Sequence, residues 1–140
     1  MKVLFDTNII LDVLLVRDPF FSLSANLSDA VENKDIDGYL CATTLTTIDY
    51  LVTKFQNKTV AKQAISKLLL LYSIAEVNQS ILNLANNSDF SDFEDAVLYF
   101  SALSVGVDSI VTRNTNDFTS AHLPVYTPSQ LWVLLTSSPT

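Results

Sequence analysis

Short apolar runs alternate along the chain with stretches in which apolar residues recur every three or four positions. The runs have the length and composition of buried parallel strands, whereas the wider spacing predicts helices. The expected strands are residues 2–5, 36–42, 74–77 and 109–111, with a short edge element at 124–126. Strands that alternate with helices indicate an α/β protein. We expect a three-layer α/β/α sandwich around a short, mainly parallel central sheet.

Polar residues that favour helix starts divide the helical stretches. We expect N-terminal caps at Asp18, at Thr43 or Thr44, at Asn57, at Asn78 and at Thr127. Asp18 precedes Pro19, a pair typical of a cap and first helical turn, so a helix is predicted from there to about residue 33. Pro128, directly after Thr127, gives the same signal for the last helix.

A further helix is predicted to begin at residue 91, and it carries three acids near its start. Ser91 and Glu94 have the spacing of a capping box, and Gly106 is a typical helix end. Asp92, Glu94 and Asp95 crowd the positive end of this helix, where the dipole favours one or two acids. Three acids within four residues indicate more than capping. Because Asp95 lies past the predicted cap, we expect it to have a functional role.

Three acidic or polar segments that are distant in the sequence are expected to meet. Asp6 follows the first predicted strand, and Asn114 and Asp117 follow the fourth. In a parallel sheet with right-handed crossovers, the carboxyl ends of all strands lie along one edge. The helix that contains Asp95 runs antiparallel to the strand that it feeds, so its first turn lies near the same edge. We expect the acids to form one cluster there.

A cluster of carboxylates requires a cation, because ionised acids at close range repel one another. Oxygen ligands without a Cys or His cluster favour Mg²⁺ or Mn²⁺ over zinc. Such an ion can orient a phosphodiester, stabilise negative charge in the transition state and help to deprotonate water. The residues therefore predict a metal-dependent nuclease or phosphatase.

Two other folds also place an acid after a first strand. A phosphatase of the haloacid-dehalogenase type requires a second acid two residues after Asp6, where Asn8 stands, and a suitably placed later lysine is missing. A response-regulator receiver requires paired acids after the first strand and a lysine after the last one, and neither is present. Both alternatives are disfavoured.

The charge of the chain limits how it can contact nucleic acid. The formal net charge is −7 and only eight residues are Lys or Arg, which disfavours binding through phosphates alone. An acidic protein still acts on phosphates when a divalent cation supplies the positive charge. Arg113, next to the proposed cluster, is the candidate for a phosphate contact. The row formed by Lys54, Lys58 and Lys62 is interpreted as a solvated helix face.

Length and composition predict a single domain that spans residues 1–140, with a frayed tail at about 137–140. A chain of 140 residues with 49% hydrophobic content is long enough to bury a sizeable core. No apolar run reaches the roughly eighteen residues of a membrane span, and the one cysteine, Cys41, excludes an internal disulfide. We expect a soluble cytoplasmic protein without membrane contact.

The chemistry-bearing segments resemble a known family. They are Asp-Thr-Asn at residues 6–8, Phe-Glu-Asp-Ala at 93–96, Val-Thr-Arg-Asn at 111–114 and Asp-Phe at 117–118. In order and separation, and over nearly the whole chain, these segments resemble the motifs of the PIN-domain family. That family consists largely of Mg²⁺- or Mn²⁺-dependent ribonucleases and includes the VapC-type toxins of bacterial toxin–antitoxin pairs.

The resemblance implies an endoribonuclease that cleaves RNA with Mg²⁺ or Mn²⁺ and leaves a 5′-phosphate and a 3′-hydroxyl. By the same resemblance, Asp6 and Asp95 are metal ligands, and Asn114 and Asp117 complete the site. The supporting residues are Thr7, Asn8, Glu94 and Thr112. A homodimer and a small antitoxin partner are also implied, since toxin-type members usually have both.

The sequence departs from the family pattern at one position. Toxin-type members usually carry a Glu in the helix after the second strand, and this chain has no Glu there. Asp49 is our candidate for the fourth catalytic acid, although a different register would put Thr46 or Thr47 at the acidic position. The departure leaves open a second reading, a PIN-fold binding module with a degenerate, non-catalytic site.

Overall fold

The structure, a computed structural model, describes residues 1–137. The elements follow one another as β1 (Lys2–Phe5), α1 (Thr7–Leu14), α2 (Phe21–Glu32), β2 (Asp37–Cys41), α3 (Ala42–Phe55), α4 (Lys58–Leu71), β3 (Ser73–Ala75), α5 (Gln79–Asn86), α6 (Phe93–Val105), β4 (Ser109–Val111), the 3₁₀ helix η1 (Thr115–Phe118), β5 (Val125–Tyr126) and α7 (Pro128–Thr136). Every expected strand is present, and β4 has the predicted bounds.

The five strands form one sheet in the order β3-β2-β1-β4-β5, and every pair is parallel. The first strand of the chain therefore lies in the middle, with Leu4 opposite Tyr39 of β2 and Ile110 of β4. The short strand β5 pairs with β4 and forms one edge, as expected. The predicted three-layer α/β/α architecture is confirmed, and the sheet is parallel throughout.

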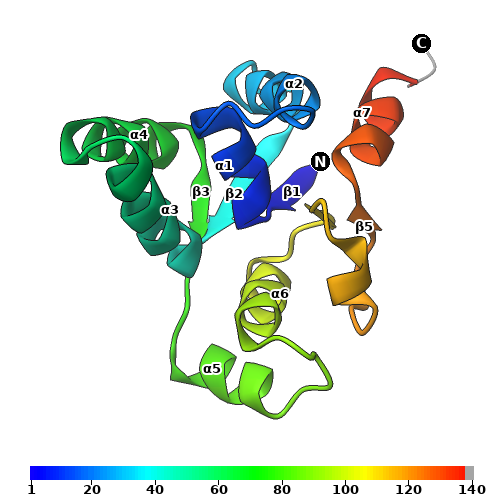
Figure 1. The fold of residues 1–140 in the computed structure, drawn as a ribbon. Coiled ribbons are helices and arrows are strands. Elements are labelled where there is room, and N and C mark those ends of the chain that lie inside the picture. The colour runs from blue at the N-terminus through cyan, green and yellow to red at the C-terminus, as the bar shows by residue number, and fades with distance from the viewer. Residues whose placement is uncertain (138–140) are drawn as a thin grey trace.

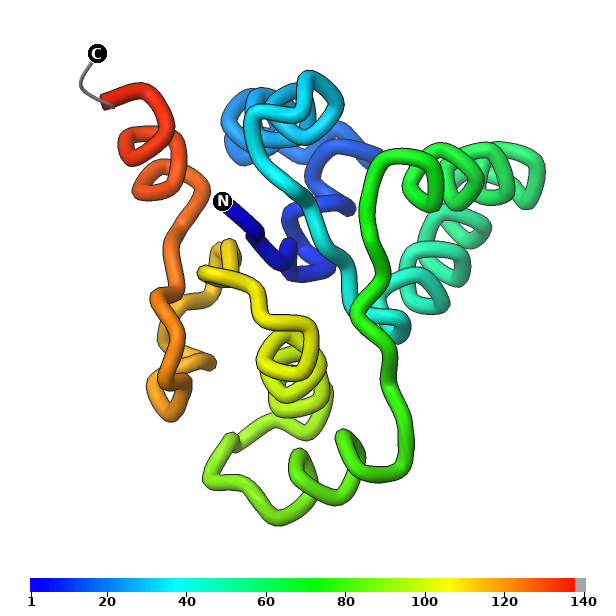
Figure 2. Tube along the Cα trace, turned by 180° about the vertical axis from the view of Figure 1, so that it is seen from behind, coloured from blue at the N-terminus to red at the C-terminus, as the bar shows by residue number. Residues whose placement is uncertain are grey.

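Side chains of the central strands alternate between two cores, one on each face of the sheet. Val3 and Phe5 belong to a core shared with α1, α2, α3, α4 and α7, whereas Leu4 belongs to a second core with α5 and α6. Figure 1 shows α5 and α6 together, apart from α1 to α4, and Figure 2 shows the same separation from behind. Since β1 is covered on both faces, a continuous apolar run forms a strand there.

Three of the predicted caps are confirmed. The side chains of Asn57, Asn78 and Thr127 accept hydrogen bonds from the backbone N–H groups of Val60, Ile81 and Gln130. Thr127 and Gln130 form a complete capping box, with Pro128 at the first helical position. These caps are local interactions within one helical turn, so their residues can be read from the sequence.

The predicted cap at Asp18 is wrong, because α2 begins only at Phe21. The backbone N–H groups of Phe20 and Phe21 both donate to the carbonyl of Arg17. This turn separates Asp18 from the helix, and the Asp18–Pro19 peptide bond in it is cis. The turn thereby brings Phe20 to the start of α2.

The expected cap at Thr43 or Thr44 is also wrong. Helix α3 begins at Ala42, directly after β2, and its N-cap residue is Cys41, which makes no side-chain capping bond. The two threonines therefore lie inside the first helical turn, and Thr44 is free to point into the protein, where it is buried.

Two remaining expectations concern the ends of the chain and membranes. Of the predicted frayed tail, Ser137 forms the C-cap of α7, and the other three residues lie outside the described part of the chain. Within residues 1–137, no helix has both the length and the apolar character that crossing a membrane requires.

Candidate functional site

Asp6 lies where β1 ends and α1 begins, and it is the N-cap of α1. One carboxylate oxygen accepts a hydrogen bond from the backbone N–H of Thr7 at 2.7 Å. The other accepts from the Thr112 hydroxyl at 2.7 Å and from the Asn8 side-chain amide at 3.4 Å. All three donors are neutral, and within residues 1–137 no Lys or Arg forms an ion pair with this buried carboxylate.

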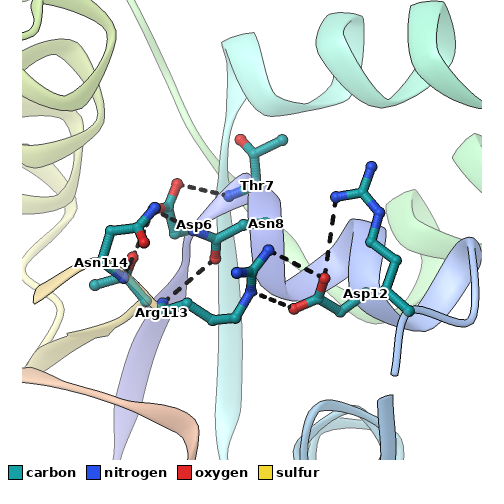
Figure 3. A network of polar contacts seen from close by, with 8 residues as sticks. Asp6, Thr7, Asn8, Asp12, Arg113 and Asn114 are labelled. Carbon is teal, nitrogen blue, oxygen red and sulfur yellow. Dashed lines mark hydrogen bonds and ion pairs between the residues drawn. The ribbon is translucent and has the colours of Figure 1, made fainter. Parts of the chain in front are cut away.

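The end of β4 is fixed to the same turn by a chain of polar contacts, most of which are drawn in Figure 3. Besides its bond to Asp6, the Thr112 hydroxyl accepts from the backbone N–H of Asn114 at 3.0 Å. The Arg113 backbone N–H contacts the Asn8 side-chain oxygen at 3.5 Å. Two segments more than 100 residues apart in sequence therefore hold each other in place.

The start of α6 corrects one prediction. The helix begins at Phe93, and its cap is Asp92, whose carboxylate accepts from the backbone N–H of Asp95 at 3.2 Å. Ser91 and Glu94 therefore do not form the predicted capping box, because the cap is Asp92, one residue later than expected. Asp95 lies in the first turn, where the helix dipole favours an acid, so its position alone does not indicate a function. Gly106 ends the helix in the left-handed conformation, as predicted.

The case for Asp95 rests on its surroundings. Burial, together with the negative charges of Asp6, Asp92, Asp117 and Glu94, raises the pKa of Asp95 to about 7. Burial also raises the pKa of Asp6, against the effect of its hydrogen bonds from Thr112 and Thr7, and Glu94 and Asp117 add to the rise. Asp6 from β1, Asp95 from α6 and Asp117 from η1 therefore share one electrostatic environment.

The donor chemistry of this acid cluster (Asp6, Asp95 and Asp117) suits a hard divalent cation, since all its ligand atoms are oxygens. Mutual repulsion of the carboxylates is relieved when such a cation binds. In the described part of the chain, however, no three His, Cys, Asp or Glu side chains are already close enough to hold one ion together. Mg²⁺ commonly binds through one or two carboxylates, with water and substrate phosphates as its other ligands. The residues fit that mode of binding.

The structure does not bring Asp49 to the acid cluster. Asp49 is exposed on α3, whereas Thr44 is buried and its hydroxyl lies 2.9 Å from that of Thr7. At the angular step of an α-helix, Asp49 lies about 140° around α3 from Thr44, and Thr47 only about 60°. Of the positions considered from the sequence, Thr47 lies nearest to Thr44 around the helix. It is a threonine, and its hydroxyl donates to the backbone of Thr43 at 3.2 Å.

Arg113 is already engaged by a residue that the sequence analysis did not single out. Its guanidinium donates to Asp12 through Nε at 2.7 Å and through Nη2 at 3.3 Å (Figure 3), and it lies over the ring of Phe20 at 4.0 Å. Arg17 approaches the same carboxylate at 4.0 Å. Asp12 is fully buried. An acid inside the apolar stripe of α1 was the available signal, since such a residue needs a cationic partner.

A family model described as PIN domain matches residues 2–116. Solved structures share the fold. FitAB bound to an IR36 DNA fragment has a TM-score of 0.71 at 18% identity over 90% of this chain and 94% of that one. A toxin–antitoxin complex from Klebsiella pneumoniae has a TM-score of 0.67 at 23% identity, over 90% and 97%.

A third similar structure is VapC20 from Mycobacterium tuberculosis, described as a toxin that cleaves the sarcin–ricin loop. Its TM-score is 0.64 at 15% identity, over 77% of this chain and 86% of that one. No curated protein sequence matches the chain at a significant level. At these identities the structural similarities establish the fold, and the family model establishes the family.

Proposed function

The chain belongs to the PIN-domain family, and we propose that it is a Mg²⁺- or Mn²⁺-dependent endoribonuclease. The observation that carries the proposal is the convergence of Asp6, Asp95 and Asp117 from three separate elements at one edge of the sheet. The charge of Asp117 raises the pKa values of Asp6 and Asp95, and the charge of Asp6 adds to the rise at Asp95. A site of this kind is suited to a divalent cation and the phosphodiester that the cation binds.

Each residue of the acid cluster has a separate task in this proposal. Asp6 is held rigidly by Thr7 and Thr112, so it is the fixed ligand. Asp95 is half-buried and has a pKa near neutrality, so it loses its proton when a cation binds. Asp117 and Asn114 lie on the exposed segment after β4 and would supply further oxygen ligands to the ion. The cation, when bound, stabilises charge on the phosphate and lowers the pKa of water.

Replacement of the acids tests this function. We expect Asp6→Asn and Asp95→Asn to lower the rate of RNA cleavage at least a hundredfold. Loss of a residue that only supports a metal ligand costs up to about a hundredfold, and loss of a ligand itself should cost no less. Asp29→Asn is the matched control, because Asp29 is an exposed acid on α2 and should leave the rate unchanged. Cleavage by the purified Asp6→Asn protein at the original rate would contradict the proposal.

The partners follow from the similar proteins. FitAB was solved on DNA and the Klebsiella pneumoniae protein in a toxin–antitoxin complex, which supports a role as the toxin of such a pair, held inactive by a cognate antitoxin in the cytoplasm. The chain itself forms a homodimer in this proposal. Light scattering after gel filtration measures the mass directly, and a monomer at every concentration would exclude the homodimer.

One observation favours a second candidate function, a PIN-fold binding module without catalysis. Thr47 lies closer than Asp49 to the helix face of Thr44, so we infer that it stands where toxin-type members usually have a Glu and that the site has one acid fewer. A thermal-melt titration with Mn²⁺ separates the two functions. A catalytic site binds the ion and raises the melting temperature, whereas a degenerate site shows no rise at any Mn²⁺ concentration.

A further inference from the structure

The edge of the sheet that carries the acid cluster also carries a hollow of about 250 Å³. Its walls include Pro19 and Phe20 before α2, Arg113 after β4, and Thr127, Pro128 and Ser129 at the start of α7. The hollow is connected to the acids through the backbone, because Arg113, which lines it, directly follows Thr112, whose hydroxyl donates to Asp6. We call it the edge hollow.

One wall of the edge hollow is flat and rigid. The Arg113 guanidinium lies over the Phe20 ring, with its central carbon 4.0 Å from the ring centroid. Its two bonds to the buried carboxylate of Asp12 fix its position. A guanidinium and an aromatic ring are both surfaces on which the bases of single-stranded RNA stack.

The wall contains one cationic side chain, that of Arg113, although the whole chain has a net charge of −7. The chain has two arginines, Arg17 and Arg113, and both lie at the carboxylate of Asp12, at 4.0 and 2.7 Å. One carboxylate therefore faces two guanidinium groups. Guanidinium groups attract the sugar–phosphate backbone of a nucleic acid.

We propose that the edge hollow binds a single nucleobase of the RNA strand, one that neighbours the phosphate held at the acid cluster. Its volume is below the roughly 300 to 1,000 Å³ of pockets for drug-sized ligands, and a lone planar base requires less space than those. The hydroxyl of Ser129, which is exposed, is available to hydrogen-bond the edge of the base. This inference rests on the proposed ribonuclease function and extends it to substrate recognition.

Asp12 is a positioning residue in this proposal. It touches neither the base nor the phosphate, but it holds Arg113 over Phe20 and so keeps the stacking surface in place. The same bond restrains the segment from Thr112 to Asn114, which contacts Asp6 and Asn8. The base site and the acid cluster are therefore connected through a single arginine.

The test is a titration of the metal-free protein followed by nuclear magnetic resonance of the backbone amides. The probes are AMP, CMP, GMP and UMP, with ribose 5-phosphate as the control that lacks a base. We expect at least one nucleotide to shift the amide signals of Phe20, Arg113 and Ser129 in a saturable way. Ribose 5-phosphate should bind at least tenfold more weakly, because it cannot stack.

Two variants identify the stacking surface. Phe20→Ala should weaken binding of the nucleotide at least tenfold, and Phe20→Leu should do the same, since leucine retains apolar bulk but has no aromatic face. Tyr50→Ala is the matched control. Tyr50 is an exposed aromatic residue on α3 that does not line the edge hollow, so its loss should leave binding unchanged.

Several results would overturn the proposal. A base site would be excluded if no nucleotide, at concentrations up to about 10 mM, shifted the three amide signals; that is ten times a dissociation constant of about 1 mM. Equal binding of ribose 5-phosphate would show a phosphate site instead. Unchanged binding by Phe20→Leu would exclude stacking on this ring. The titration needs neither metal nor cleavage, so it fails independently of the ribonuclease function, which fails if Asp6→Asn cleaves RNA normally.

Discussion

Asp6 and Asp12 lie six residues apart around one helix, and both are buried, but the protein treats them differently. Asp12 is fully buried and faces two arginines. Asp6 is 7% exposed and receives hydrogen bonds from neutral groups alone, while other acids raise its pKa. A buried carboxylate that is paired with arginine side chains has a structural role. A carboxylate without such a partner remains available to bind an ion from solution.

The largest expected effect is the loss of folding stability in Asp12→Asn, compared with a small change in Asp6→Asn. Removal of one partner from a buried ion pair costs about 3 to 5 kcal/mol, and Asp12→Asn leaves Arg113 mostly buried without its counter-charge. Asp6→Asn removes a charge that burial disfavours, so the free energy of unfolding should change by less than about 1 kcal/mol. Urea denaturation of both variants measures this, and equal losses would remove the distinction.

Metal binding gives the next largest effect. An ion at one hundred times its dissociation constant stabilises the folded state by about 2.7 kcal/mol. We expect Mn²⁺ or Mg²⁺ to raise the melting temperature of the wild type and to leave that of Asp95→Asn unchanged. Asp29→Asn, with its substitution on α2 far from the cluster in sequence, serves as the control and should respond like the wild type. A rise in Asp95→Asn of the same size would place the ion elsewhere.

The pH dependence of the metal-free protein should be smaller. The folded pKa of Asp95, about 7, lies above the ordinary 3.8, so its stabilising contribution is complete below pH 3.8 and is lost as the pH rises through 7. A shift of that size corresponds to about 4 kcal/mol, and solvent screening at a half-exposed carboxylate reduces it to about 1 kcal/mol. Unfolding measured from pH 4.5 to 8 should show this decline in the wild type and a smaller one in Asp95→Asn, where Asp6, whose pKa is also raised, remains.

The smallest effect is expected at Asp49. Its side chain is exposed on α3 and lies away from the acid cluster, so Asp49→Asn should change the free energy of unfolding by less than about 0.5 kcal/mol and leave RNA cleavage unchanged. Thr47→Glu is the informative partner variant, because it adds an acid on the helix face that Thr44 occupies. If Asp49→Asn abolished cleavage, the register of α3 at the site would be wrong.

Much of the fold could be predicted from the sequence because its signals are local. Strand β4 is buried at all three residues, so its apolar run has sharp limits, and Asn78 caps a helix within its own turn. Ser91 and Asp92 are both favourable N-cap residues, however, and the sequence does not show which of the two neighbours caps α6. The turn that displaces Asp18 from α2 depends on a backbone bond to Arg17, which the residue types do not reveal.

The site could be predicted where topology alone brings residues together. Asp6 and Asn114 follow neighbouring strands of a parallel sheet, so their proximity follows from the order of the elements. The pairing of Asp12 with Arg113 joins residues 101 positions apart and depends on side-chain directions that a single sequence does not contain. The choice between Asp49 and Thr47 depended on the rotation of α3, which was fixed only once its start at Ala42 was known.

The central place of β1 has a consequence for the synthesis of this protein. Its partner β4 and the residues Thr112, Asn114 and Asp117 come more than 100 residues later, so a nascent chain that has only its first three strands cannot complete the acid cluster. If the protein cleaves RNA, it becomes active only after nearly all of the described residues have left the ribosome. The order of strands in the sheet therefore delays activity until the chain has been synthesised beyond Asp117.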